Sequence, residues 1–371
     1  MSKRAVSAAA KAVFVIAEAG VNHNGSLDFA LQLVDVAAEA GADAVKFQTF
    51  RAKDLVSAGA PQARYARRAV GAAQSQIEMI RALELGWSAH RVLAQRCRQR
   101  GIEFLSTPFG ADLVDKLIAE TGMRRVKLPS GEITNPFLLL AAAKTGRPII
   151  LSTGMSTLAE VQQALRVLAF GMTGRGRGSM AAFADAYATA KARMALLERV
   201  TLLHCTTEYP APFESVHLRA MDTLAETFGL AVGYSDHTKG TAVAIAAVAR
   251  GAAVIEKHFT LDRALPGPDH AASLEPDELA AMVTAIRDVE SALGQSTKTV
   301  AKAERANRAV ARRSLVARRR IPAGTVLTAA DLTCKRPGTG ISPMRYWEVL
   351  GQPATRDYMP DELIEDATKS S

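Results

Sequence analysis

The chain has 371 residues, of which 48% are hydrophobic and 22% are charged, so it can bury a large core and is not intrinsically disordered. No apolar run reaches the roughly 18 residues of a membrane-spanning helix, and we expect no membrane association. Residues 301–340 account for most of the net charge of +9, but they lack the interleaved aromatic side chains of a nucleic-acid platform, so we expect an anionic small molecule rather than a nucleic acid as partner.

Residues 1–12 are interpreted as an N-terminal extension. They carry basic residues before a short apolar stretch, as a signal peptide does, but Lys11 and Glu18 interrupt the apolar run. The three cysteines, Cys97, Cys205 and Cys334, are far apart and form neither a disulfide framework nor a CxxC metal pair. We therefore expect a reduced, cytoplasmic protein.

Short β-branched runs alternate with segments of helical period over residues 13–293, which is typical of repeated βα units. Eight such units predict a TIM (β/α)₈ barrel. A doubly wound sheet is the alternative, but no GxGxxG follows the first run. The eight runs begin at Val13, Asp43, Ile102, Arg124, Arg147, Arg199, Leu230 and Ala252.

Two connections are longer than a barrel needs. Residues 51–84 follow the second strand, and we predict that they form a lid over the active site. After Gly171 we predict a Gly- and Arg-rich loop followed by one extra helix.

The C-terminal part reads as a separate unit. Residues 294–308 are polar and are interpreted as a linker. Residues 309–371 combine short strands with Gly and Pro turns and predict a small β-rich domain. A domain of this size is marginally stable alone, so we expect it to pack against another surface.

Polar side chains occupy the predicted carboxyl ends of nearly all the barrel strands, where TIM barrels place their active sites. Buried charges on so many strands would be costly without a function. The candidates from the strand ends are Glu18, Lys46, Gln48, Thr107, Lys127, Ser130, Glu132, Ser152, Tyr209, Ser235, His237 and His258.

His237 and His258 are candidate metal ligands. They are 21 residues apart, one βα unit, and each follows a predicted strand. Neighbouring parallel strands are about 4.8 Å apart, so both imidazoles can reach one ion. Two histidines with many oxygen donors suit Mn²⁺ or Mg²⁺. The alternative is a pair of core histidines bonded to backbone carbonyls.

Lys46 and Lys127 allow three interpretations. Either lysine could form a Schiff base, bind a phosphate or carboxylate as a point charge, or pair with Glu18 or Glu132. Three nearby hydroxyls favour anion binding, and the two glutamates are then candidates for acid/base chemistry. The hydroxyls belong to Ser130, Ser152 and Ser235.

The chain closely resembles the sialic acid synthase family of phosphoenolpyruvate-condensing enzymes. The resemblance covers about residues 12–360 and continues through RRSLVARRRIPAG and KRPGTGISP near the C-terminus. It rests on many ordered motifs, namely EAGVNHNGS, KFQTF, STPF, KLPSGE, LSTGM, HCTTEYPAPF, GYSDHT, EKHFTLD and PGPDHAASLEP.

The resemblance implies a TIM barrel joined to an antifreeze-like (SAF) domain in a domain-swapped homodimer, with Mn²⁺ or Mg²⁺ on His237 and His258. It implies N-acetylneuraminate synthesis from phosphoenolpyruvate and N-acetylmannosamine. The alternatives are an N,N'-diacetyllegionaminate synthase acting on 2,4-diacetamido-2,4,6-trideoxymannose and, more distantly, a Schiff-base sugar-acid lyase.

The resemblance also implies a role for each site residue. Lys46, Thr107, Lys127, Ser130, Ser152 and Ser235 correspond to residues around phosphoenolpyruvate, and Gln48, Tyr209 and Asp269 to residues around the amino-sugar. Glu18 and Glu132, with Lys46, correspond to catalytic positions, and Arg336 corresponds to an arginine that enters the partner's active site.

Overall fold

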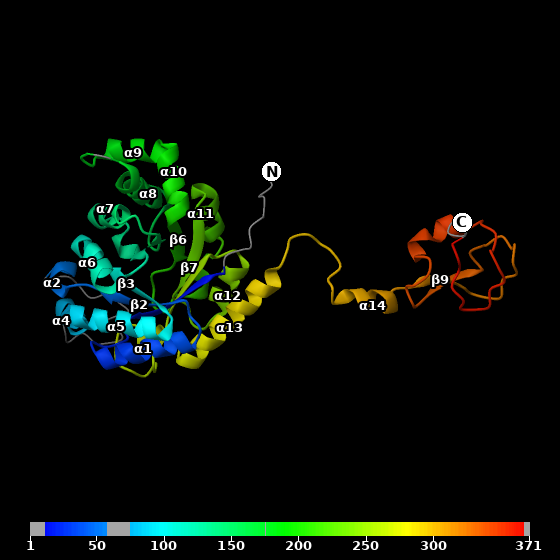
Figure 1. Cartoon of the computed structure of the whole chain (residues 1–371), viewed down its shortest axis with the longest axis horizontal. Coiled ribbons are helices and arrows are strands. Elements are labelled where there is room, and N and C mark those ends of the chain that lie inside the picture. The colour runs from blue at the N-terminus through cyan, green and yellow to red at the C-terminus, as the bar shows by residue number, and fades with distance from the viewer. Residues whose placement is uncertain (1–11, 58–74, 175, 367–371) are drawn as a thin grey trace. The chain divides into compact units, whose positions relative to one another are not determined.

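The computed structural model describes residues 12–57, 75–174 and 176–366 (Figure 1). They form two compact units, and the boundary between the units along the chain is between Gly294 and Gln295. Residues 1–11 of the predicted extension and residues 58–74 of the predicted lid lie outside the described ranges. No helix in the described ranges is both long and apolar enough to span a membrane.

The first unit is a nearly closed barrel of eight parallel strands, which confirms the predicted fold. Parallel ladders follow the order β3-β2-β1-β8-β7-β6-β5-β4, and β3 and β4 lie next to each other. All eight predicted runs form strands. They are β1 (Phe14–Gly20), β2 (Ala44–Thr49), β3 (Glu103–Pro108), β4 (Val126–Leu128), β5 (Ile149–Ser152), β6 (Val200–Cys205), β7 (Ala231–Asp236) and β8 (Val254–His258).

Eight helices, one after each strand, cover the outside of the barrel (Figure 1). In the first of them, Ala30, Leu33, Val34 and Ala37 are buried, the i, i+3, i+4, i+7 spacing of one apolar face. The eight are α1 (Leu27–Glu39), α5 (Trp87–Arg100), α6 (Ala111–Thr121), α7 (Pro136–Lys144), α8 (Leu158–Thr173), α11 (Ala220–Phe228), α12 (Ala242–Ala249) and α13 (Pro276–Leu293).

The strands are buried on both faces, because one face packs on the helices and the other fills the barrel. Side chains alternate along a strand, so the residues on either side of a cavity-lining position point towards the helices. Val15 and Ala17 of β1 belong to the main apolar core, whereas Glu18 lines the interior. This alternation determines which polar side chains meet inside the barrel.

The insertion after Gly171 differs from the prediction. Helix α8 continues to Thr173, and two helices follow instead of one, α9 (Met180–Ala188) and α10 (Ala190–Arg199). Thr189 separates them, because its backbone is extended and its hydroxyl accepts a hydrogen bond from the amide of Ala192. Phe183 packs edge-to-face on Phe170 of α8, with ring centroids 5.1 Å apart, so the insertion packs on the barrel.

The second unit is the predicted small β-rich domain. Strands β9 (Ser314–Ala317) and β10 (Leu332–Lys335) pair antiparallel around a core of its own, which includes Ile321, Leu332 and Tyr358. It also contains the short helices η4 (Pro343–Arg345) and α15 (Tyr346–Val349). Helix α14 (Glu304–Ala311) precedes the sheet and buries none of its side chains.

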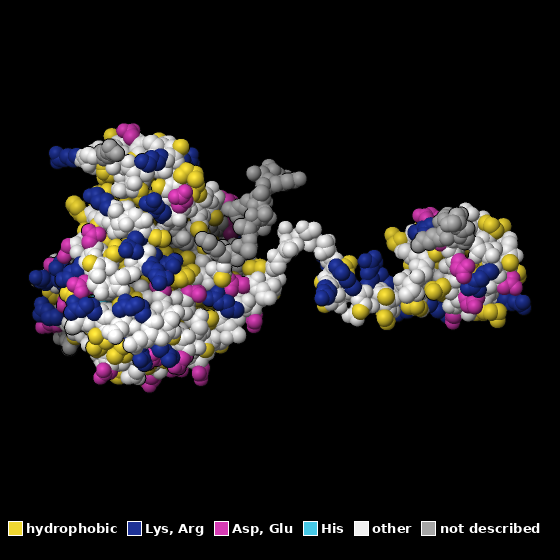
Figure 2. All heavy atoms as spheres, viewed as in Figure 1, with side chains coloured by type: hydrophobic (Ala, Val, Ile, Leu, Met, Phe, Trp, Pro, Cys, Tyr) yellow, Lys and Arg dark blue, Asp and Glu magenta, His cyan; other side chains and the backbone are white. Residues whose placement is uncertain are grey.

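Basic side chains gather on and just after α14, where they are exposed to solvent (Figure 2). They belong to the Lys- and Arg-rich stretch that carries most of the net charge.

Candidate active site

A cavity of about 430 Å³ opens at the carboxyl ends of the barrel strands. All thirteen site residues that the sequence placed in the barrel line it, whereas Arg336 lies in the second unit and is exposed there. The thirteen are Glu18, Lys46, Gln48, Thr107, Lys127, Ser130, Glu132, Ser152, Tyr209, Ser235, His237, His258 and Asp269.

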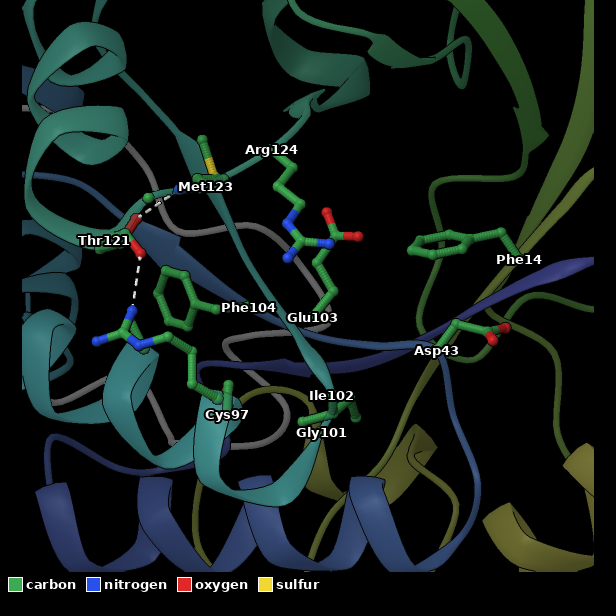
Figure 3. A pocket seen from close by; sticks show the side chains of 13 residues that line it. Phe14, Asp43, Cys97, Gly101, Ile102, Glu103, Phe104, Thr121, Met123 and Arg124 are labelled. Carbon is green, nitrogen blue, oxygen red and sulfur yellow. Dashed lines mark hydrogen bonds between the residues drawn. The ribbon is translucent and has the colours of Figure 1, made fainter.

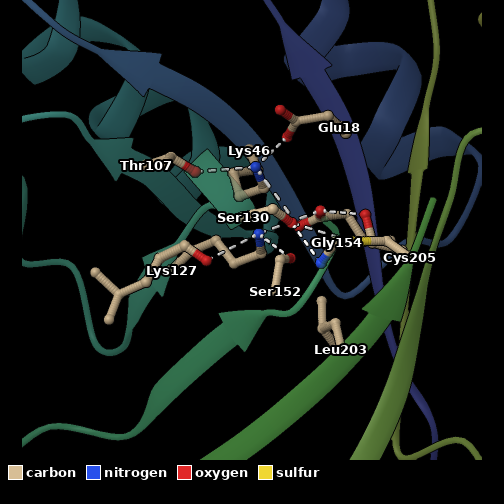
Figure 4. A network of polar contacts seen from close by, with 12 residues as sticks. Glu18, Lys46, Thr107, Lys127, Ser130, Ser152, Gly154, Leu203 and Cys205 are labelled. Atoms are coloured by element: carbon tan, nitrogen blue, oxygen red, sulfur yellow. Dashed lines mark hydrogen bonds and ion pairs between the residues drawn. The ribbon is translucent and has the colours of Figure 1, made fainter. Parts of the chain in front are cut away.

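Lys46 on β2 lies at the centre of a buried polar network (Figure 4). Its Nζ is 2.7 Å from Oε2 of Glu18 and donates to the hydroxyl of Thr107 at 3.0 Å. Because β1 pairs with β2 and β2 with β3, Glu18, Lys46 and Thr107 are brought together at one end of three adjacent strands. Of the two candidate lysines, Lys46 is therefore the one that pairs with Glu18.

Lys127 on β4 donates to the hydroxyl of Ser152 at 2.8 Å (Figure 4). Its carboxylate partner is Glu256 of β8, with Nζ 3.4 Å from Oε1, and Ser235 donates to the same oxygen at 2.8 Å. Glu256 Oε2 is also 3.5 Å from Nζ of Lys46. Glu256 thus bridges both lysines.

Glu132 does not pair with a lysine among the described residues. It ends the short helix η1 (Ser130–Glu132), and its carboxylate accepts a hydrogen bond from the side-chain amide of Asn135 at 2.6 Å. Glu18 and Glu132 were predicted as possible ion-pair partners of the lysines, whereas Glu256 was not. The signal for Glu256 was present, because it precedes His258 by two residues on one strand and so points to the same side.

Burial and the lysines set the ionisation of the two glutamates. Burial raises the pKa of Glu18 to about 7, although Lys46 opposes this shift. Burial alone would also raise the pKa of Glu256, but Lys127 and Lys46 together lower it to about 2. The two carboxyl groups therefore differ in ionisation, since Glu256 stays ionised and Glu18 can exchange a proton near neutral pH.

The pKa values of Lys46 and Lys127 shift in opposite directions. Burial alone would lower the pKa of Lys46, but Glu18 and Glu256 outweigh it, so this pKa is raised. The pKa of Lys127 is lowered, mainly by burial.

His237 and His258 face each other, with ring centroids 5.6 Å apart. Nδ1 of His237 lies 2.7 Å from the carbonyl oxygen of Thr206. A carbonyl only accepts, so Nδ1 carries the proton and Nε2 keeps a free lone pair. Nδ1 of His258 is buried and has no hydrogen-bond partner among the described residues. Burial lowers the pKa of both rings, so they are neutral, as metal ligation requires.

Two groups border the histidine pair. The ring of Tyr209 lies 4.3 Å from that of His237 and 5.6 Å from that of His258, measured between centroids. Asp269 Oδ2 is 4.0 Å from Nδ1 of His258, and burial raises the pKa of Asp269 to about 6. The described residues contain no group of three His, Cys, Asp or Glu side chains arranged around a metal site. Within these ranges, His237 and His258 are the side chains that could hold a divalent cation, with water or substrate oxygens as its other ligands.

Gly154 follows β5 where side chains leave no room for a Cβ atom. A Cβ there would lie 2.4 Å from the hydroxyl of Thr207 and 2.9 Å from both Cys205 Sγ and Ser130 Oγ. Its amide donates to Ser130 Oγ at 2.9 Å, which orients that hydroxyl. Cys205 and Thr207 line the cavity but were not among the predicted site residues, and Thr207 Oγ1 is buried with no hydrogen-bond partner in the described ranges.

A second cavity, of about 490 Å³, lies at the amino ends of the strands (Figure 3). Asp43 and Glu103 line it, and both are ion-paired, since Asp43 Oδ2 is 2.7 Å from Arg287 Nη2 and Glu103 Oε1 is 2.8 Å from Arg125 Nε. None of the site residues that the sequence indicated lines this cavity. The amino-end cavity is therefore not the candidate active site.

The chain is similar to known proteins along almost its whole length. The family model described as "NeuB family" matches residues 33–298, and that described as "SAF domain" matches residues 312–368. The N,N'-diacetyllegionaminic acid synthase of Campylobacter jejuni is 47% identical over 96% of this chain and 100% of the relative. The Legionella pneumophila protein of the same name is 45% identical over 91% of this chain and 89% of the relative.

A solved structure resembles the chain as well. The N-acetylneuraminic acid (sialic acid) synthetase from Leptospira borgpetersenii matches with a TM-score of 0.65 and 31% identity, covering 80% of this chain and 90% of that one.

Proposed function

This chain belongs to the NeuB family, and on that premise we propose that it condenses phosphoenolpyruvate with 2,4-diacetamido-2,4,6-trideoxymannose and water, giving N,N'-diacetyllegionaminate and phosphate. From the sequence, N-acetylneuraminate synthesis was expected first and this reaction was the alternative. The comparisons support the alternative better, with 47% identity to a diacetyllegionaminic acid synthase against 31% to a sialic acid synthetase. The observation that carries the chemistry is the convergence of two buried lysines and several hydroxyls beside two neutral histidines.

Phosphoenolpyruvate binds to the cationic side of the cavity. Lys46 and Lys127 supply positive charge, and both are buried, so an anion there is weakly screened. The phosphate and carboxylate accept hydrogen bonds from the hydroxyls around the lysines, those of Thr107, Ser130, Ser152 and Ser235. Glu256 holds both ammonium groups in place.

The condensation forms a carbon–carbon bond and a carbon–oxygen bond to water, and it breaks the carbon–oxygen bond to phosphate. C3 of phosphoenolpyruvate attacks the aldehyde carbon of the open-chain sugar, and positive charge develops at C2. Water adds to C2, and Glu18 takes the proton that this water loses and passes it to the former aldehyde oxygen, which becomes a hydroxyl. The C2–O bond to phosphate then breaks, and the remaining C2 hydroxyl gives its proton to the departing phosphate as it becomes the ketone. The pKa of Glu18, raised to about 7, suits both taking up and releasing a proton. Glu132 at the cavity edge is the second candidate for this role.

His237 and His258 would hold a divalent cation, Mn²⁺ or Mg²⁺, and Tyr209, Gln48 and Asp269 border the space for the sugar. When bound, the cation supplies Lewis-acid polarisation of the aldehyde oxygen. The carbonyl of Thr206 fixes the tautomer of His237, so the lone pair on Nε2 is ready for ligation.

The active site is proposed to be shared between two chains. Arg336 follows β10 in the second unit and is exposed there. In a domain-swapped homodimer its guanidinium would reach the partner's sugar site and donate paired hydrogen bonds to substrate oxygens, which a lysine cannot copy.

The test is an assay of phosphate release with phosphoenolpyruvate and each sugar, with mass spectrometry of the product. We expect turnover of the diacetamido sugar, lost on chelation and restored by Mn²⁺ or Mg²⁺. A preference for N-acetylmannosamine would overturn the assigned acceptor. Turnover that survives exhaustive chelation, with a borohydride-trapped adduct on Lys46 or Lys127, would overturn the reaction class in favour of a Schiff-base lyase.

A further inference from the structure

The active-site cavity has two unlike sides. The strand ends contribute lysine, hydroxyl, imidazole and carboxylate groups. The connections after β1, β2 and β3 contribute an apolar wall instead. The wall consists of Val21, Phe50, Leu55, Val56, Met79, Ile80, Leu83 and Phe109.

Helix α4 (Gln76–Ala82) forms much of this wall. Four of its cavity-lining positions, Gln76, Met79, Ile80 and the C-cap Leu83, follow the i, i+3, i+4, i+7 spacing of one helix face. Ser75 starts the helix with a capping box. None of the four side chains is fully buried, and all four line the cavity.

Two polar contacts hold the connection after β2, which carries most of the wall, in place. The amide of Ala52, at the start of the short helix α2 (Ala52–Leu55), donates to the carboxylate of Glu84, just after α4. The guanidinium of Arg51 is 2.6 Å from Oδ2 of Asp112 on α6. The two ends of the connection after β2 are therefore held together beside the cavity.

Gln76 adds one polar group to the apolar wall. Its Oε1 is buried and has no hydrogen-bond partner among the described residues. A buried acceptor without a partner is costly, and this one belongs to a residue that lines the cavity. It is therefore placed to accept an N–H or O–H from a ligand.

Phosphoenolpyruvate does not account for this wall, because it is a small anion that the lysine side of the cavity binds. The acceptor sugar must therefore contact the wall. We infer that the α4 face of Gln76, Met79, Ile80 and Leu83 selects a 6-deoxy sugar with a second acetamido group. The apolar side chains contact the C6 and acetyl methyl groups, and Gln76 Oε1 accepts the amide hydrogen of the second acetamido group.

This inference rests on the proposed function and adds the residues that read the acceptor. The same wall disfavours N-acetylmannosamine, since its C6 hydroxyl would lose water against methyl and methylene groups without gaining a partner. A pocket that distinguishes substrates by one such group changes kcat/KM by about 10- to 200-fold.

The experiment compares Ile80→Ala and Gln76→Leu with the matched control Ile77→Ala. Ile77 is on the same helix but does not line the cavity. For each variant, kcat/KM is measured with the diacetamido sugar and with N-acetylmannosamine, together with the KM for phosphoenolpyruvate. We expect both test variants to lower the ratio of the two kcat/KM values by about tenfold or more, with the control and the KM for phosphoenolpyruvate close to wild type.

The outcomes separate this inference from the proposed function. A wild-type preference for the diacetamido sugar that survives unchanged in both test variants, or equal losses for the two sugars, overturns the role of α4 and leaves the proposed function standing. A wild-type enzyme that prefers N-acetylmannosamine overturns the proposed function itself. If Ile80→Ala fails to fold, Met79→Gln keeps the side-chain length, makes the wall polar, and is judged by the same ratio.

Discussion

The two ends of the barrel differ in whether their polar side chains have partners within the protein. At the amino end, Asp43 pairs with Arg287 and Glu103 pairs with Arg125, across the surface of the barrel. At the carboxyl end, Thr207 Oγ1 and His258 Nδ1 are buried without a hydrogen-bond partner among the described residues. The carboxylates named at the amino end have protein partners, whereas these two buried atoms at the carboxyl end have none among the described residues.

The difference shows how one barrel separates stability from chemistry. Partly exposed ion pairs at the amino end contribute modestly to folding. Buried, incompletely paired groups at the carboxyl end oppose folding and are retained where a ligand uses them. Mutations at the two ends should therefore produce different phenotypes.

The largest effect is expected from His237→Ala and His258→Ala. Each should lower kcat by about a thousandfold or more, because loss of a metal ligand removes several kcal/mol of transition-state stabilisation. Steady-state rates with added Mn²⁺ and thermal unfolding curves check this. His204→Ala is the matched control, since its Nε2 lies 2.7 Å from the carbonyl oxygen of Val216 and its ring does not line the cavity. Near wild-type turnover by either test variant would contradict the metal assignment.

A smaller but specific effect is expected from Lys127→Met. It should raise the KM for phosphoenolpyruvate by about a hundredfold and change the KM for the sugar much less, because it removes a buried charge from the anion side. Initial rates at varied concentrations of each substrate measure this.

Lys257→Met is the control for Lys127→Met. Lys257 is also a buried lysine, but it pairs with Asp236 at 2.8 Å and does not line the cavity. Its loss should lower stability without a selective change in the KM for phosphoenolpyruvate. A selective effect in Lys257→Met equal to that in Lys127→Met would remove the distinction between the two lysines.

Mixing two inactive variants tests whether a second chain completes the carboxyl-end cavity. If Arg336 acts in trans, a heterodimer of Arg336→Ala and His237→Ala holds one site with both lesions and one site with neither. Activity should then return towards one active site per dimer. Each homodimer, refolded alone by the same procedure, is the control. No recovery after verified subunit exchange would mean that Arg336 serves its own barrel.

The smallest effect is expected at the amino end. Asp43 accepts a hydrogen bond from the amide of Val15 at 2.7 Å and pairs with Arg287. Asp43→Ala should lower the free energy of unfolding by about 1 kcal/mol, since the pair is partly exposed. Urea denaturation measures this loss, and kcat/KM should stay within about twofold of wild type. A large loss of kcat/KM in a folded variant would break the division between the two ends.

The strand pattern of the sequence predicted the eight strands and twelve of the cavity-lining residues. It could do so because strand runs are recognisable locally, and because parallel strands in a barrel present their carboxyl ends on one face. The resemblance supplied Asp269, which no strand pattern indicates. The extra helix after Gly171 was predicted as one element, because the break at Thr189 depends on a single residue that caps α10.

Only the tertiary structure decided which groups pair across the barrel and what faces them. Glu256 rather than Glu132 joins Lys127, and Gln76 lies in the cavity although it is far along the chain from every strand end. Side-chain direction along a strand alternates with a period of two and can be read from the sequence. Distances across a barrel depend instead on strand tilt and stagger, and the position of α4 depends on how the connection after β2 folds back, which no local pattern encodes.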